Sequence, residues 1–209
     1  MSTSNSLTYR TLASYRRVEL LHLVQESPGS TLAELVDATG IHINTVREHM
    51  QRLIDEGFVV AKSEHRTTRG RPRVLYSAAT GADDTAAARE RLTGAVQRAE
   101  ALRRYAPEAV LGDDTVFADE ALNQLDALDD HLDRAGFDPA LDTTKLEVEL
   151  SGCPYREMVD EHRDVVCSVH LGIIRTVLSH AGGPVSADRL LPFTTPGCCT
   201  LALSVDPTD

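Results

Sequence analysis

The sequence predicts an α+β protein, and two observations support this fold class. Apolar residues recur at helical spacing in several stretches, whereas in others they alternate with polar residues as in a strand. Charge also divides the chain of 209 residues. Residues 1–80 carry ten basic and eight acidic residues, and residues 81–209 carry 11 and 24. The net charge is therefore +2 in the first part and −13 in the second, so only the first part suits a nucleic-acid partner.

The first 80 residues predict three helices followed by a two-stranded hairpin. The expected helices span about 12–25, 31–40 and 42–53, and the expected strands span 58–61 and 73–77. The second helix is the best delimited, because Thr31 and Glu34 have the spacing of a capping box and Gly40 suits the left-handed residue that ends a helix. The third helix has an apolar stripe that should face the core, made of Val46, Met50, Leu53 and Ile54.

Polar side chains cover the face of the third helix that this stripe leaves free. A DNA-reading helix needs such side chains, because its polar face meets the base edges while its apolar face anchors it. Arg47 suits guanine, Asn44 or Gln51 suits adenine, and Thr45 suits a phosphate. A solvated helix face is the alternative for any one of them. The predicted DNA-contacting residues of this helix are Asn44, Thr45, Arg47, Glu48, Gln51 and Arg52.

The expected hairpin carries four arginines in eight residues, namely Arg66, Arg69, Arg71 and Arg73. Gly70 allows the loop to turn, and Pro72 stiffens it in an extended form. An extended loop with arginines at its tip suits the narrow, electronegative minor groove of A·T tracts. We therefore count these four arginines as DNA-contacting candidates, with a solvated basic turn as the alternative.

The order of helices, turn and basic hairpin over about residues 10–80 resembles the winged helix-turn-helix of ArsR-like bacterial regulators. The resemblance implies a homodimer that binds a near-palindromic operator in double-stranded DNA. A further helix, expected at 85–105, is the candidate dimer contact through Leu92, Val96 and Leu102, with an ordinary core helix as the alternative. The predicted domains are a DNA-binding domain at 1–80, a linker and dimerisation helix at 81–112, and an α+β sensor domain at 113–209.

The sensor domain is expected to alternate helices and strands. Leucines at helical spacing predict a helix over 115–135, and polar–apolar alternation predicts a strand over 145–150. A helix over 154–180, broken near His162, and a strand over 199–205 complete the expected elements.

All four cysteines lie in this domain. Cys153 follows a predicted strand. Cys167 lies three residues before His170 on a predicted helix, so Cys167 and His170 share a helix face. Cys198 and Cys199 begin the last strand. Thiolate-rich sites with an imidazole suit zinc or an iron–sulfur cluster. The alternative is that the cysteines are not ligands and serve as small, buried hydrophobic residues of the core.

The segments around Gly152-Cys153-Pro154-Tyr155, Val166-Cys167 and Gly197-Cys198-Cys199 resemble the C-terminal domain of SufR-like repressors. The resemblance implies a redox sensor with an iron–sulfur cluster, 4Fe-4S or 2Fe-2S, that represses cluster-assembly genes. It implies Cys153, Cys167 and one of Cys198 or Cys199 as ligands. Because the last two cysteines are adjacent, unlike those of that family, the fourth ligand stays open. We prefer three cysteines with His170, and Cys199 before Cys198.

The remaining expectations concern location and chemistry. The polar N-terminus and the lack of a membrane-length apolar run predict a cytoplasmic protein without a membrane partner. The sequence offers no glycine-rich phosphate loop and no paired carboxylates, so we expect a protein that is not an enzyme. Two alternatives are a regulator with a structural zinc that senses a small ligand and, from another class, a thiol-dependent enzyme that uses Cys167 with His170.

Overall fold

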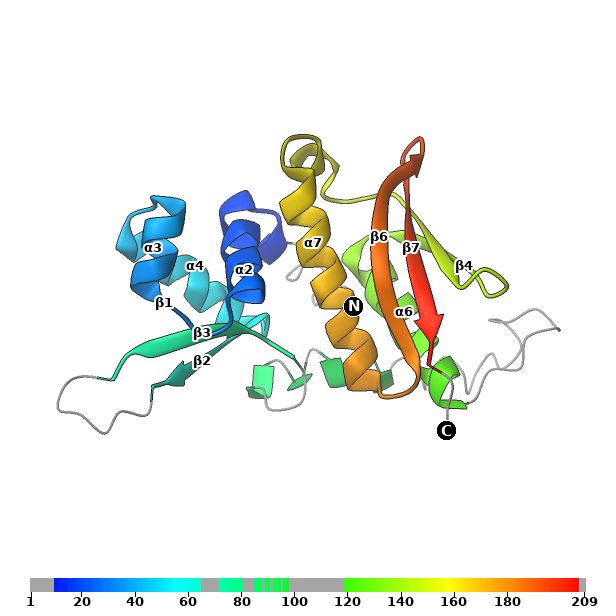
Figure 1. Cartoon of the computed structure of the whole chain (residues 1–209), viewed down its shortest axis with the longest axis horizontal. Coiled ribbons are helices and arrows are strands. Elements are labelled where there is room, and N and C mark those ends of the chain that lie inside the picture. Colours follow the sequence, from blue (N-terminus) through cyan, green and yellow to red (C-terminus); the bar gives the residue numbers. More distant parts are fainter. Residues whose placement is uncertain are drawn as a thin grey trace. The chain divides into compact units, whose positions relative to one another are not determined.

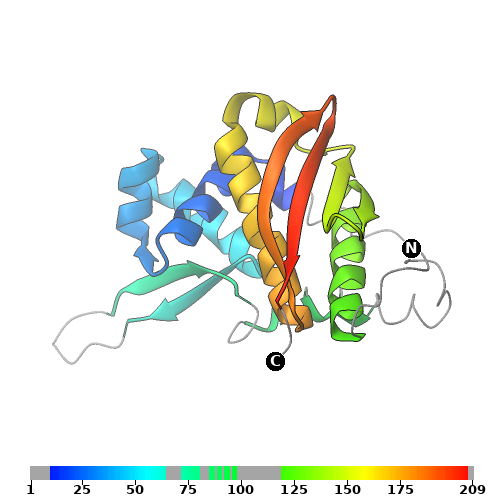
Figure 2. The same ribbon diagram turned by 45° about the vertical axis from the view of Figure 1, so that its right-hand side comes forward.

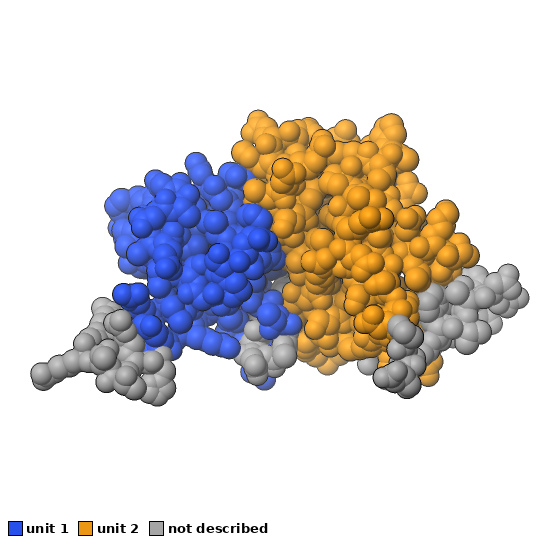
Figure 3. Space-filling model, in the orientation of Figure 1, with its two compact units in different colours: residues 1–91 blue, residues 92–209 orange. Residues whose placement is uncertain are grey.

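A computed structural model of the chain describes residues 10–64, 72–80, 85–87, 89–90, 92–94, 96–97 and 119–206. The chain forms two compact units, residues 1–91 and residues 92–209 (Figure 3). Within the described residues, no helix is both long enough and apolar enough to span a bilayer.

Among the described residues of unit 1, three helices pack on one side of a small antiparallel sheet (Figure 1). Its helices are α2 (Tyr15–Glu26), α3 (Leu32–Thr39) and α4 (Ile43–Asp55). Its strands are β1 (Ser30–Thr31), β2 (Val59–Ser63) and β3 (Val74–Ala78), in the sheet order β1-β3-β2. The three predicted helices and the hairpin are confirmed.

The capping box predicted for the second helix is present at the start of α3. The Thr31 hydroxyl accepts a hydrogen bond from the Glu34 amide at 3.4 Å, and the Glu34 carboxylate accepts one from the Thr31 amide at 2.7 Å. Gly40 ends α3 in the left-handed region, with φ of 65°. α4 begins with His42 as its N-cap, and the His42 Nδ1 accepts a hydrogen bond from the Asn44 amide at 3.3 Å.

The core of unit 1 lies between α2, α3 and α4. Its largest fully buried side chains are Leu20, Leu21, Leu35, Met50 and Leu53. The stripe predicted for the third helix is therefore confirmed at Val46, Met50 and Leu53, which are buried, whereas Ile54 is only half-buried. This packing fixes which face of α4 points away from the core.

Unit 2 contains a four-stranded antiparallel sheet with two helices running alongside it (Figure 2). The elements are α6 (Asp119–Ala135), β4 (Asp138–Asp142), β5 (Glu147–Ser151), α7 (Arg156–Ala181), β6 (Val185–Thr195) and β7 (Cys198–Val205). The sheet order is β4-β5-β7-β6. Alternate residues of β5 and β7 are buried, so the helices cover a single face of the sheet.

Two strands of unit 2 were not expected from the sequence. β4 contains Pro139 and two aspartates, and β6 contains Pro192 beside an irregularity between Leu191 and Thr195. Proline lowers the strand signal of a sequence, but it is tolerated in edge strands, and both strands lie at the edges of this sheet. The break predicted near His162 is confirmed, because this residue has non-helical φ and ψ of −134° and 42° inside α7.

Helical residues described between 86 and 97 belong to unit 2 from Leu92 onward. Leu92 is buried against Ala127 of α6 and Val177 of α7, and Val96 packs on the same cluster. These two residues, predicted as dimer contacts, therefore face the core of their own chain, as the alternative assignment expected. Leu102 lies outside the described residues.

Gln124 joins three segments of unit 2 inside the core. Its side-chain amide donates to the carbonyls of Leu178 and Val185 at 2.9 and 3.0 Å, and its oxygen accepts from the Val185 amide at 2.6 Å. All polar atoms of this buried side chain have partners. It therefore fixes the turn between α7 and β6 against α6.

Candidate nucleic-acid interface and cysteine pocket

The face of α4 opposite its buried stripe is exposed and mostly polar. Of the residues predicted to contact DNA, Asn44, Arg47, Glu48, Gln51 and Arg52 are exposed, whereas Thr45 is half-buried. Ile43, which the sequence analysis did not single out, is exposed as well. The structure therefore brings five predicted residues together on one accessible helix surface.

Hydrogen bonds along this face hold two of its side chains in place. Arg47 donates from Nη1 to the Asn44 side-chain oxygen at 2.9 Å, and Gln51 donates to the Asp55 carboxylate at 2.8 Å. An arginine held by a neighbour loses less freedom when it forms a forked pair of hydrogen bonds. Arg47 and Asn44 thus form a preorganised polar pair near the start of α4.

The hairpin after α4 places one predicted arginine on the surface. Arg73 is exposed, and its carbonyl accepts from the Glu64 amide at 2.8 Å, which extends the β2–β3 pairing by one step. Arg66, Arg69 and Arg71 lie outside the described residues.

A pocket in unit 2 collects three of the four cysteines and one histidine. Its cavity volume is about 20 Å³, which is room for about one water molecule. Its lining consists of Phe137, Leu150, Cys153, Tyr155, Val159, Val166, Cys167, His170, Leu190 and Cys199. The pocket therefore offers two kinds of possible metal-binding group, thiols and an imidazole, within apolar surroundings.

Three elements bring these donors to the pocket. Cys153 follows the end of β5, Cys167 and His170 lie on α7, and Cys199 on β7 pairs with Leu150 of β5. Cys198 does not line the pocket. Successive residues of a strand point to opposite faces, so the buried side of β7 that carries Cys199 is not the side that carries Cys198.

His170 is buried in the pocket wall without a partner for one ring nitrogen. Its ring stacks on Phe137, with centroids 4.5 Å apart and an interplanar angle of 7°. Its Nε2 is buried and has no hydrogen-bond partner among the described residues. Burial lowers the pKa of His170 to about 4, so the imidazole is neutral at pH 7. A neutral imidazole with an unpaired nitrogen is the form of histidine that binds metals.

Burial raises the pKa of two pocket thiols, those of Cys153 and Cys167. The pKa of Cys167 rises to about 11, first through desolvation and then through the neighbouring Cys199 and Cys153. The pKa of Cys153 is also raised by desolvation, with a further contribution from Cys199. These thiols are therefore protonated at pH 7, which is the opposite of what an activated cysteine nucleophile needs.

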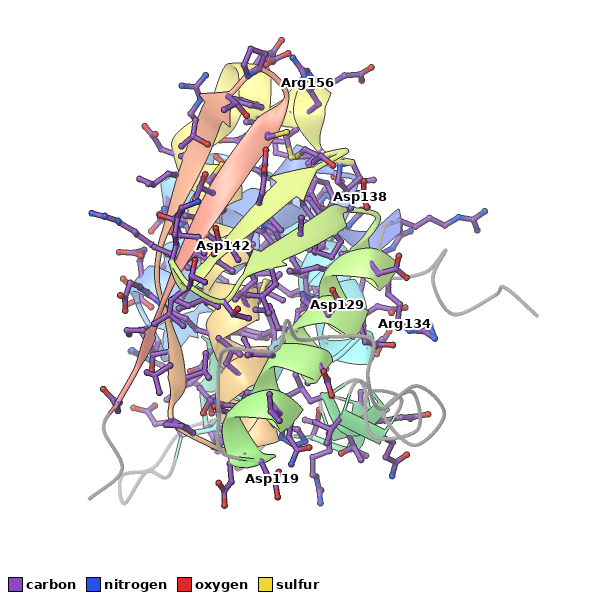
Figure 4. All side chains as sticks on the ribbon, turned by 90° about the vertical axis from the view of Figure 1, so that its right-hand side faces the viewer. Asp119, Asp129, Arg134, Asp138, Asp142 and Arg156 are labelled. Carbon is purple, nitrogen blue, oxygen red and sulfur yellow. The ribbon has the colours of Figure 1, made fainter. Side chains whose placement is uncertain are left out.

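Two arginines lie near the cysteines and share one aromatic ring. The guanidinium carbons of Arg156 and Arg163 are 5.5 and 5.2 Å from the Phe193 ring centroid. Arg156 lies at the end of the unit opposite Asp119 (Figure 4). The positive charge of Arg163 lowers the pKa of Cys167, and that of Arg156 lowers the pKa of Cys153, although burial outweighs both effects.

The donor types of the pocket suit a soft metal, but the donors do not meet at one point. Within the part of the chain that the structure describes, no three Cys, His, Asp or Glu side chains are arranged so that they could hold a metal ion. All four cysteines are free thiols. A metal would therefore require the side chains around the pocket to turn toward a common centre.

Comparison with known proteins bears on unit 1. Residues 14–60 match a family model described as winged helix-turn-helix DNA-binding. This match supports a winged-helix regulator. It runs from the residue before α2 into β2 and so includes the whole of α4. Neither the curated proteins nor the solved structures gave a match.

The match also favours one class of function. A winged helix-turn-helix domain points to a DNA-binding transcriptional regulator rather than an enzyme. The raised pKa of Cys167 agrees with this, because a thiol-dependent enzyme would need a thiolate.

Proposed function

We propose that this protein is a DNA-binding transcriptional repressor whose operator affinity depends on an iron–sulfur cluster in the cysteine pocket. The observation that carries the proposal is the composition of that pocket. Cys153, Cys167, Cys199 and His170 line one cavity, in a unit joined to a winged helix-turn-helix domain. One ring nitrogen of His170 is buried without a partner among the described residues. Buried polar atoms without partners are rare in proteins and call for an explanation, and a bound ion is one such explanation.

Cys153, Cys167, Cys199 and His170 are the residues that would hold the cluster. Bound there, it would supply one-electron redox chemistry. The apolar lining limits access of water, and the neutral His170 is ready to bind without losing a proton. The thiols must release their protons, so binding should strengthen as the pH rises.

On the DNA side, we propose a homodimer on a near-palindromic operator. Arg47 and Asn44 would read bases in the major groove, together with Gln51. Arg73 and the other arginines of the hairpin would contact the minor groove and the phosphates. Coupling between two sites in one protein is typically about 1–3 kcal/mol, or 5–150-fold in affinity, and we expect the pocket to act on operator binding within this range.

A structural zinc is the second candidate for the same pocket. Three thiolates and one imidazole form a ligand set that is common in tetrahedral zinc sites. A zinc form would lack visible colour and redox chemistry, so the regulated signal would then be different.

The first experiment is anaerobic purification of the full chain, followed by a visible spectrum and by iron, sulfide and zinc analysis. The cluster proposal expects a coloured protein with matching iron and sulfide contents. One zinc per chain in a colourless protein favours the second candidate. Failure to bind either metal, after reconstitution as well, would refute both.

Two matched variants test which cysteines take part. Cys167→Ser removes a thiol from the pocket lining, whereas Cys198→Ser removes one that does not line it. We expect the first to lose metal and the second to keep it. Operator binding by loaded and metal-free protein at one salt concentration then tests the regulatory step, because equal affinities would contradict it.

A further inference from the structure

An isoleucine is exposed at the first position of α4, the helix proposed to read DNA. Ile43, Val74 and Leu191 are the three large apolar side chains that are exposed among the described residues. Ile43 continues the helical spacing of Val46 and Met50. Yet its exposed fraction is 41%, against 0% and 1% for those two residues. The apolar stripe of α4 therefore extends past the core at the first turn of the helix. Packing within the core does not explain why position 43 carries an apolar side chain.

The neighbours of Ile43 are the preorganised polar pair. Residues four apart on a helix lie side by side, so Ile43 borders Arg47, whose guanidinium is held by the Asn44 side chain at 2.9 Å. The other exposed side chains of α4 are polar or charged. Ile43 is thus a single apolar side chain at the edge of a hydrogen-bonding surface.

We propose that Ile43 contacts the C5-methyl group of a thymine next to the base pair that Arg47 reads. This inference rests on the proposed DNA-binding function and adds a determinant of operator sequence to it. The thymine methyl is the one apolar group that a base edge offers in the major groove, and apolar side chains are the groups that recognise it. Arginine hydrogen bonds select guanine, and Ile43 selects thymine beside it, which excludes cytosine because cytosine lacks the methyl group.

The test removes this methyl group and nothing else from the DNA. A duplex is first selected from a random library by the full-length protein, and each thymine is then replaced by deoxyuridine. In each half-site, we expect replacement of one particular thymine to weaken binding of the wild-type protein about fourfold, which is the effect of losing one buried methyl group. For Ile43→Ala the same replacement should change the affinity less than twofold, because the partner of the methyl group is already gone.

Matched controls separate this contact from general effects. Leu191→Ala removes a comparably exposed apolar side chain from the other unit and should keep the full response to deoxyuridine. Since Ile43 is exposed, Ile43→Ala should unfold at the same urea concentration as the wild type. If the wild type and Ile43→Ala respond equally to every replacement, or if the wild type responds to none, the inference is overturned. If no duplex is selected at all, the proposed DNA-binding function itself fails.

Discussion

Replacing His170 by phenylalanine should stabilise the metal-free protein. The wild type buries Nε2 without a hydrogen-bond partner among the described residues, and leaving such a group unpaired costs about 1–3 kcal/mol. Phenylalanine removes the nitrogen and keeps a ring that can stack on Phe137, now at 4.5 Å. Fitting the slightly larger ring opposes this gain and offsets part of it. We expect a net increase of about 1 kcal/mol in the free energy of unfolding of unit 2.

The assay is urea unfolding with a chelator present, read by pulsed hydrogen exchange and mass spectrometry on peptides from α7. These peptides report on unit 2 alone, which matters because the chain has two units. A gain of 1 kcal/mol should raise the midpoint by roughly 0.5 M urea. The matched control is Gln124→Leu, which also removes a buried polar side chain, but one whose atoms are all hydrogen-bonded. It should lower the stability by about 2–4 kcal/mol.

The two variants should therefore shift stability in opposite directions, although both replace a buried polar residue by an apolar one. A loss of stability of about 1 kcal/mol or more in His170→Phe would refute the reasoning, because Nε2 would then have a partner in solution. The same variant should weaken metal binding. A residue that costs stability until metal arrives is expected of a ligand and not of a core residue.

Three further predictions follow from the site and the fold. Burial lowers the pKa of His170 from 6.5 to about 4, so as the pH falls the unfolded chain takes up this proton before the folded protein does. Between pH 7 and pH 5, the free energy of unfolding of the metal-free wild type should therefore fall by about 2 kcal/mol relative to that of His170→Phe, as measured by urea unfolding. Arg163→Gln removes a charge that lowers the pKa of Cys167, so alkylation of this thiol at pH 8.5 should slow. Arg189, an exposed residue of β6, is not among the charges that shift this pKa, so Arg189→Gln should leave the rate unchanged. Thr31→Ala removes the N-cap of α3 and should lower the stability of unit 1 by about 1 kcal/mol in thermal unfolding, and an unchanged midpoint would contradict the cap's role.

The sequence predicted those parts of the fold that depend on local signals. The capping box of Thr31 and Glu34, the glycine end at Gly40 and the break of α7 at His162 are all encoded within a few residues. β4 and β6 were missed because their strand character comes from pairing with β5 and β7, whereas their own sequences contain proline. Non-local pairing outweighs local propensity in such edge strands.

The candidate sites show the same limit. Helical spacing would assign Ile43 to the core with Val46, and only the end of the core at the first turn of α4 exposes it. The gathering of Cys153, Cys167 and Cys199 around one pocket depends on β5, α7 and β7 meeting in space. Strand alternation is a local rule, and it could have assigned Cys198 and Cys199 to opposite faces once the buried positions of β7 were known.

The adjacent cysteines of β7 make the pocket tolerant of changes in strand register. Moving a strand by one residue exchanges its inward and outward side chains. β7 follows the short turn after β6, where the pairing is already irregular between Leu191 and Thr195. Inserting or deleting one residue in that turn would shift the register of β7 by one residue. Leu201 would then point to the outer face of the sheet, and Cys198 would point to its inner face. The chain would then lose much of its strand core, but the pocket would still contain a third thiol at the same strand end.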